Sequence, residues 1–244
     1  MNFYSLIIGT ELLNGRRVDK HFTFLNEELN KRGLTHRANF IIKDDAKLIE
    51  QTFEFIKQDE NAVMFCFGGI GATPDDLTRE IAAKVFTCKP LSLHVEAKEL
   101  IEKQFGVEAY PHRINMAMLP QNAKLLHNVI NNVPGFYLEE RYFFTPGFPS
   151  MAWPMITWAL DTLFETKVKP YSHNFIVYTG ESDLIEMMQK IPNQIELSSL
   201  PKIVEGQRQV EMYLSSFDKD LLNFCYEDFL LHVKQKGFTC KVLD

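Results

Sequence analysis

The stretch of sequence that decides the fold is residues 62–76, which read AVMFCFGGIGATPDD. Its first six residues are all apolar, as expected for a strand buried on both faces of a sheet. Three glycines follow: Gly68, Gly69 and Gly71. Glycine lets a backbone turn tightly and lets its N–H groups approach an anion. Thr73 has the right type and place to cap a helix, with Pro74 at the first helical position and Asp76 completing a capping box. The stretch predicts a buried strand, a loop able to bind phosphate and a helix starting after Thr73.

Strands and helices alternate ahead of this stretch. Residues 3–8 form a short apolar run and residues 35–42 are interpreted as a second strand, whereas residues 19–32 and 46–58 carry apolar side chains at helical spacing. Such alternation predicts a parallel sheet covered by helices on both faces. In these sheets ligands bind beyond the carboxyl ends of the strands. The segments expected to meet at that edge are residues 9–11, 43–45 and 68–76.

The pattern changes after a segment that contains Lys167, Lys169 and Pro170, which we interpret as a linker. Before it, we expect helices over 77–86, 94–105 and 149–164. Beyond it, the order becomes strand, helix, strand, strand, helix, strand, which is the split βαβ pattern. The predicted architecture is a three-layer, mostly parallel α/β domain over residues 1–167. A small α+β domain follows over residues 172–244.

Composition and charge exclude several classes of partner. The chain has 32 acidic and 26 basic residues, and its net charge of −6 opposes binding to nucleic acid or to an anionic membrane. Its four cysteines lie far apart and form no zinc or redox motif, as in a reducing compartment. No apolar run approaches the roughly 20 residues needed to cross a bilayer. We therefore expect a soluble cytoplasmic protein.

Acidic residues at the strand ends suggest a metal site. Glu11, Asp45 and Asp76 come from three separate loops. Carboxylates beside a phosphate-binding backbone would repel the ligand unless a divalent cation stood between them, and oxygen ligands favour magnesium or manganese over zinc. Simpler explanations stay open. Asp75 and Asp76 also suit the start of a helix, and Glu11 and Asp45 also suit solvated loops.

Two other segments are candidates for the same crevice. Pro146 and Gly147 stand between a strand and a helix, where they form either a turn or a second ligand-facing backbone. His112 and Arg113 lie in a loop that either supplies positive charge or stays at the surface. The chain has no P-loop, nucleophile elbow or zinc-protease motif.

Several segments resemble the successive motifs of the amino-terminal region of the CinA family. They are residues 8–15 (IGTELLNG), the pair Asp44-Asp45 and residues 68–80 (GGIGATPDDLTRE). The match continues through residues 134–136 (PGF) and 146–149 (PGFP), and residues 180–184 (GESDL) resemble the start of CinA's small second domain. The resemblance thus covers most of the chain.

The resemblance implies a molybdopterin-binding fold, shared with MoaB, MogA and MoeA, and metal-dependent hydrolysis of the pyrophosphate bond in ADP-ribose, FAD and related dinucleotides. It assigns Glu11, Asp45 and Asp76 to catalysis and to a magnesium, manganese or cobalt ion. The residues that it assigns to the substrate phosphate are Gly68, Gly69, Gly71, Thr73, Asp75, Pro146 and Gly147. Relatives form dimers or trimers, so a homo-oligomer is expected.

The chain also departs from the family pattern. Ala72 replaces a proline, and Met151 stands where CinA has a glutamate, which removes an acid near the site. The chain ends before the carboxy-terminal deamidase domain of many CinA proteins, so the resemblance does not transfer deamidase activity to it.

Two functions remain open after these observations. The first is a metal-dependent nucleotide pyrophosphatase. The second is a non-catalytic protein that binds molybdopterin or a nucleotide in molybdenum-cofactor metabolism, and the missing acid at Met151 favours it. A third role, nucleic-acid binding by a KH-like small domain, is disfavoured because residues 172–244 lack a GxxG loop and the chain is acidic.

Overall fold

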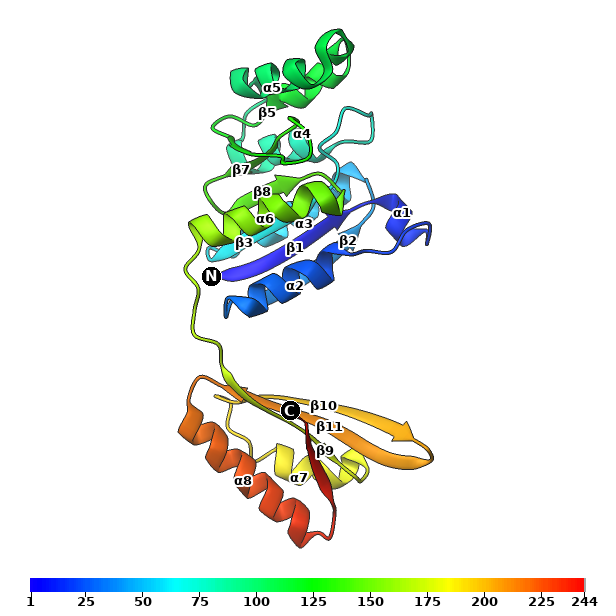
Figure 1. Ribbon diagram of the computed structural model, residues 1–244, viewed down its shortest axis with the longest axis vertical. Coiled ribbons are helices and arrows are strands. Elements are labelled where there is room, and N and C mark those ends of the chain that lie inside the picture. Colours follow the sequence, from blue (N-terminus) through cyan, green and yellow to red (C-terminus); the bar gives the residue numbers. More distant parts are fainter. Residues whose placement is uncertain (244) are drawn as a thin grey trace. The chain divides into compact units, whose positions relative to one another are not determined.

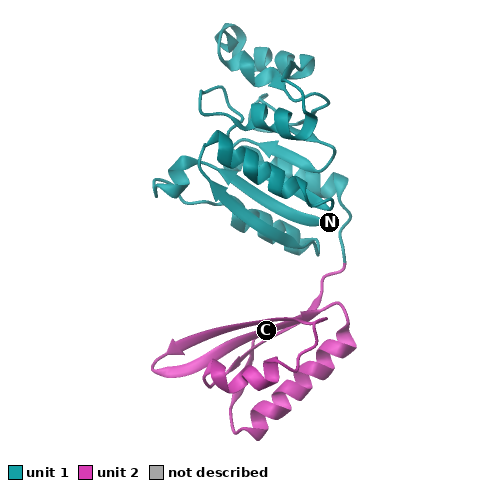
Figure 2. Ribbon diagram, turned by 180° about the vertical axis from the view of Figure 1, so that it is seen from behind, with its two compact units in different colours: residues 1–167 teal, residues 168–244 magenta. Residues whose placement is uncertain are grey.

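The computed structural model describes residues 1–243. The chain divides into two compact units, Met1–Lys167 and Val168–Asp244 (Figure 2). No helix within the described residues combines the length and apolar character that a membrane crossing requires.

The first unit is built on a six-stranded sheet. Its strand order is β2-β1-β3-β8-β7-β6. The strands are β1 (Asn2–Ile8), β2 (His36–Ile42), β3 (Ala62–Phe67), β6 (Lys124–Leu126), β7 (Gly135–Leu138) and β8 (Tyr142–Thr145). The first four in spatial order run parallel, and β7 and β6 are antiparallel to their neighbours. The predicted mostly parallel sheet is therefore confirmed.

Helices cover both faces of this sheet, giving three layers (Figure 1). On one face, α2 (His21–Lys31) and α6 (Pro149–Leu163) pack with Phe3 and Ile7 of β1. On the other face, α3 (Ala46–Lys57) and α4 (Thr78–Ala82) pack with Leu6 and Ile8 of the same strand. Successive side chains of a strand point to opposite faces, so a continuous apolar run such as β1 supplies both cores.

Shorter elements complete the first unit. They are α1 (Thr10–Leu13), a π-helical turn η1 (Ala83–Thr87), α5 (Val95–Phe105), and the 3-10 turns η2 (Gly106–Ala109) and η3 (Arg113–Ala117). A two-stranded ladder joins β4 (Ser92–Leu93) to β5 (Met118–Leu119). His94 caps α5 by accepting a hydrogen bond from the backbone N–H of Ala97.

The helix predicted over residues 77–86 begins at Thr78 and continues through η1 to Thr87, so its bounds are close, but Thr73 does not cap it. The Asp76 carboxylate instead accepts hydrogen bonds from the backbone N–H of Thr73 at 2.8 Å and from its hydroxyl at 2.5 Å. These bonds close a turn ahead of the helix. The helix itself starts where the backbone N–H of Thr78 donates to the carbonyl oxygen of Gly69 at 3.0 Å.

The second unit is a four-stranded antiparallel sheet with helices packed against it. Its elements are β9 (Tyr171–Val177), η4 (Glu181–Leu184), α7 (Ile185–Met188), β10 (Glu196–Val204), β11 (Gln207–Ser216), α8 (Lys219–Gln235) and β12 (Cys240–Leu243). The strand order is β10-β11-β9-β12. Phe175, Met212 and Phe229 lie in its core. The split βαβ pattern is confirmed, with the predicted first helix broken into η4 and α7.

Candidate functional site

The carboxyl ends of four parallel strands meet at one edge of the first unit's sheet. The backbone N–H of Gly9, after β1, donates to the carbonyl oxygen of Ile42 at the end of β2 at 3.0 Å. The N–H of Gly68, after β3, donates in the same way to Thr145 at the end of β8 at 2.9 Å. The loops that leave these strands are therefore held side by side, as expected for a ligand site in an α/β fold.

Residues 68–73, called here the glycine loop, turn sharply as they leave β3. Gly68 and Gly69 have φ angles of +101° and +70°. A Cβ on Gly68 would lie 2.4 Å from the carbonyl oxygen of Ile8, and one on Gly69 would lie 2.2 Å from the hydroxyl oxygen of Thr78. The buried Thr78 hydroxyl donates to the carbonyl oxygen of Gly68 at 3.0 Å. Both glycines are thus required by conformation and by space.

The backbone of the glycine loop offers a row of hydrogen-bond donors. Within residues 1–243, no hydrogen bond uses the backbone N–H groups of residues 69–72. Buried or half-buried backbone donors are normally paired, so such a row is suited to an added acceptor. Consecutive backbone N–H groups in a turn that includes left-handed residues form an anion-binding concavity.

A cavity of about 520 Å³, called here the glycine-loop cavity, lies beside this loop. Small-molecule sites commonly measure about 300–1,000 Å³. The predicted site residues that line it are Glu11, Gly68, Gly69, Gly71, Thr73, Asp75, Asp76, Pro146 and Gly147. Met151, at the position where the resemblance implies a glutamate, also lines it. The structure therefore brings together acids and glycines from separate loops.

Two predicted acids fold over glycines of the site. A Cβ on Gly9 would lie 3.0 Å from an oxygen of Glu11, and one on Gly71 would lie 2.6 Å from an oxygen of Asp76. Both carboxylates can approach the backbone because these residues lack side chains. Asp76 is fixed in this place by Thr73, as described above.

Asp45 departs from its predicted place. It caps α3, where its side chain accepts a hydrogen bond from the backbone N–H of Leu48 at 2.8 Å, and it does not line the cavity. Its neighbour Asp44 lines the cavity instead and accepts hydrogen bonds from the backbone N–H and the hydroxyl of Thr10 at 2.7 and 2.8 Å. Within residues 1–243, no group of three or more His, Cys, Asp or Glu side chains is arranged to hold a metal ion. Glu11, Asp45 and Asp76 thus do not form a ready-made triad.

A buried histidine supports the loop that contains Gly147. His21 is 5% exposed and stacks on Phe67 with ring centroids 4.3 Å apart. Its Nε2 lies 3.3 Å from the carbonyl oxygen of Gly147, which lines the cavity. Burial lowers the pKa of His21 below its ordinary value. A Cβ on Gly147 would lie 3.5 Å from Cα of Gly68, so His21 helps to hold the second loop against the glycine loop.

Some lining residues were not singled out in the sequence. Within residues 1–243, Arg17 is the one positively charged side chain that lines the glycine-loop cavity. The buried Asn128 accepts a hydrogen bond from the backbone N–H of Ile130 at 3.0 Å and donates to the carbonyl oxygen of Val133 at 2.9 Å. Such local bonds are typical of asparagine in turns, and the three asparagines in residues 128–132 were an available signal.

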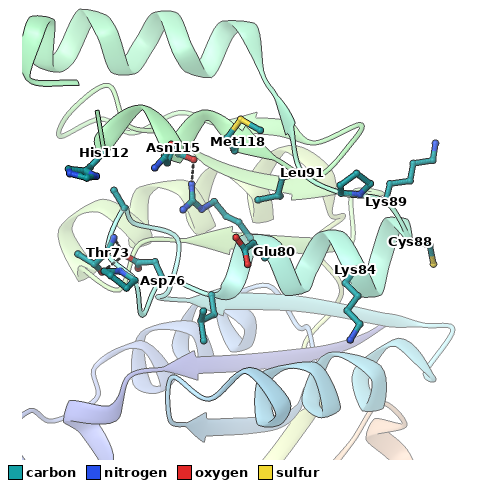
Figure 3. A pocket seen from close by; sticks show the side chains of 15 residues that line it. Thr73, Asp76, Glu80, Lys84, Cys88, Lys89, Leu91, His112, Asn115 and Met118 are labelled. Atoms are coloured by element: carbon teal, nitrogen blue, oxygen red, sulfur yellow. Dashed lines mark hydrogen bonds between the residues drawn. The ribbon is translucent and has the colours of Figure 1, made fainter. Parts of the chain in front are cut away.

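A second, larger cavity of about 1,130 Å³ lies next to α4 and is called here the α4 cavity. It shares Ala72, Thr73 and Asp76 with the first. Figure 3 shows Thr73, Asp76 and Glu80 on one side and His112, Asn115 and Met118 on the other.

The loop of His112 and Arg113 therefore faces the α4 cavity through His112 alone. Arg113 pairs with Glu108 at 2.9 Å and lies over the ring of Phe105, 4.5 Å from its centroid. Neither residue lines the glycine-loop cavity.

Comparison with known proteins covers both units. A family model described as "Probable molybdopterin binding domain" matches residues 5–165. A "Putative competence-damage inducible protein" of Alkaliphilus metalliredigens is 32% identical over 201 residues, which are 76% of this chain and 47% of that protein. A "CinA-like protein" of Kosmotoga olearia is 30% identical over 233 residues, which are 88% and 54% of the two chains. The chain spans about half the length of these relatives.

Among solved structures, the protein CinA from Thermoplasma acidophilum, described as having unknown function, is similar to this chain. It is 26% identical, with a TM-score of 0.59, and the match covers 66% of this chain and 97% of that one.

Proposed function

Because this chain belongs to the molybdopterin-binding domain family and resembles CinA-like proteins, we propose that its glycine-loop cavity binds a small phosphorylated pterin or nucleotide. The observation that carries this proposal is the row of backbone N–H groups at residues 69–72, which donate to no acceptor within residues 1–243. Phosphate oxygens are strong acceptors and suit a concavity of this kind. The cavity volume of about 520 Å³ also suits a ligand of this size.

The acidic lining of the cavity favours a second, catalytic candidate. Glu11, Asp44, Asp75 and Asp76 line the cavity against the single arginine Arg17. A phosphate beside four carboxylates is repelled unless a cation lies between them. Magnesium is commonly bound by one or two carboxylates together with ligand phosphates and water. The absence of a three-acid group in the described residues is compatible with that mode, in which the ligand completes the coordination.

In this candidate function the protein hydrolyses the pyrophosphate bond of an ADP-ribose- or FAD-like dinucleotide. Glu11 and Asp76 would hold a magnesium, manganese or cobalt ion. Such an ion supplies charge stabilisation to the phosphoryl group and lowers the pKa of bound water. The glycine-loop backbone orients the phosphate, and Thr73 keeps the Asp76 carboxylate beside that backbone. Asp45 has no part in this proposal because its carboxylate caps α3.

The test compares Asp76→Asn with Asp45→Asn. Asparagine keeps an oxygen that can accept from Thr73, and it is as good a helix cap as aspartate, so both variants are expected to fold. We would measure AMP release from ADP-ribose and from FAD with magnesium, manganese or cobalt. The hydrolase proposal expects metal-dependent release by the intact chain and by Asp45→Asn, and loss of release in Asp76→Asn.

Calorimetric titration with AMP decides between the two candidates if no AMP is released. AMP binding without hydrolysis under any metal leaves the binding function and removes the catalytic one. If neither AMP nor a pterin phosphate binds, with or without metal, the proposal for this cavity is wrong.

A further inference from the structure

The α4 cavity shares Ala72, Thr73 and Asp76 with the glycine-loop cavity, but its other lining residues have no role in the proposed function. It lies between α4 and the segment 112–118 (Figure 3). Its apolar side chains come from both walls: Pro74, Leu77, Pro90, Leu91 and Met118. Its volume of about 1,130 Å³ is ample for a small organic molecule.

The central polar residue of this cavity is Arg79, which is 7% exposed. Its guanidinium donates to the carbonyl oxygen of Gly71 at 2.6 Å and to that of Asn115. Its Nε has no hydrogen-bond partner among the described residues, and no carboxylate there lies within 4.0 Å of its nitrogens. A buried cation without an anion in direct contact is costly, so a contacting anionic partner would stabilise it.

The other charges of the lining nearly cancel. Lys84 is paired with Glu50 at 2.6 Å, whereas Asp76 keeps its negative charge although Thr73 donates to it. Arg79 and Lys89 therefore face Asp76 and Glu80, both of which act on Arg79 from beyond ion-pair distance. A singly charged anion in contact with Arg79 is opposed least, whereas a doubly charged group would be repelled more strongly by Asp76 and Glu80.

We propose that the α4 cavity is a second binding site, for a small organic monocarboxylate with an apolar or aromatic body. The planar guanidinium of Arg79 matches the two oxygens of a carboxylate, and Lys89 adds positive charge at the same cavity. The body of the ligand packs against Leu77, Leu91 and Met118. Occupation of this site does not require a phosphate at the glycine loop.

The first test is a calorimetric or NMR titration with benzoate, with benzamide as the neutral analogue of the same shape. Hydrogen bonds to charged groups contribute about 1.5–3 kcal/mol, so benzoate should bind roughly 10- to 100-fold more tightly than benzamide. Phenyl phosphate, which carries up to two charges, should bind more weakly than benzoate. Equal binding of benzamide, stronger binding of phenyl phosphate, or no benzoate binding at all would overturn the proposal.

The second test locates the site with a matched pair of variants. Leu91→Trp fills the cavity, whereas Leu93→Trp adds the same side chain at a position that is 50% exposed and outside the lining. Benzoate affinity should fall at least about tenfold in Leu91→Trp and stay unchanged in Leu93→Trp. Lys89→Gln should weaken benzoate but not benzamide. Unchanged benzoate affinity in a folded Leu91→Trp variant places the ligand elsewhere and refutes the assignment.

Discussion

The conformation of the glycine loop predicts that replacing Gly69 by alanine destabilises the first unit. At φ +70° an alanine costs about 1–2 kcal/mol in backbone conformation. Its Cβ would also lie 2.2 Å from the hydroxyl oxygen of Thr78, and overpacking of this kind costs about 1–3 kcal/mol. Gly69→Ala should therefore lower the free energy of unfolding of the first unit by roughly 2–5 kcal/mol, the sum of these two costs.

The chain supplies its own control and its own probe for this experiment. Gly15 has a similar φ of +77°, but a Cβ added there would meet no atom within 4 Å, so Gly15→Ala should show the conformational cost alone. Both tryptophans of the chain, Trp153 and Trp158, lie in α6 of the first unit. Urea unfolding followed by tryptophan fluorescence therefore reports on that unit.

A double variant separates the free-energy cost of the clash from the cost of the backbone conformation. Thr78→Ala removes the hydroxyl that meets the new Cβ, at the cost of its bond to Gly68. Gly69→Ala/Thr78→Ala should be less destabilised than the sum of the single variants by about 1 kcal/mol or more. The reasoning is refuted if Gly69→Ala costs no more than Gly15→Ala, or if the two single effects simply add.

Three other predictions use the same unit. Because burial lowers the pKa of His21, the unfolded chain binds more protons than the folded one below about pH 6.5. The free energy of unfolding, measured with urea, should therefore be highest above that pH and should fall towards pH 5. In a His21→Phe variant it should fall less. Asp45→Ala should lower the free energy of unfolding by about 0.5–2 kcal/mol as a lost helix cap without changing AMP affinity. Asp44→Ala should lower stability through the lost bonds to Thr10 and should also change AMP affinity, because Asp44 lines the cavity; equal AMP affinities of the two variants would contradict this. The exposed Cys88 should react with Ellman's reagent in the folded protein, whereas Cys66, fully buried and with a raised pKa, should react only in urea.

The parts of the fold that the sequence predicted best are those that depend on burial alone. The apolar run at residues 62–67 became β3 with the predicted bounds, because a strand buried on both faces needs apolar side chains at every position. The bounds of α3 and α6 were close for a related reason, since apolar spacing defines the buried face of a helix.

The N-cap predicted at Thr73 is wrong because the same local pattern has two structural meanings. A threonine followed three residues later by an acid fits a capping box. It fits equally well the turn that Asp76 closes on Thr73. The choice is made by contacts with residues far along the chain, namely the bonds from Thr78 back to Gly68 and Gly69. A short sequence window does not contain that information.

The sequence analysis placed Asp45 in the cavity, whereas the structure places Asp44 there, and the cause is similar. Neighbouring residues in an extended segment point in opposite directions, and Asp45 has φ −120° and ψ 121°. When Asp45 turns towards the N–H of Leu48, Asp44 turns towards Thr10 and the cavity. Both residues follow the same strand end, so the sequence identified the loop but not which carboxylate enters it.

Arg79 is the residue whose importance depends most on the tertiary structure. In the sequence it follows Thr78 in a helical segment, where an arginine is usually a surface residue. In the fold, its guanidinium joins the carbonyl oxygen of Gly71, in the glycine loop, to that of Asn115, which lies 36 residues after Arg79. The Gly71 carbonyl is thereby held by a buried donor, while the backbone N–H groups of residues 69–72 keep no internal partner. Arg79 therefore both holds the carbonyl oxygen of the glycine loop and lines the α4 cavity. A ligand that bonds to Arg79 in the α4 cavity thus acts on the backbone of the glycine loop as well.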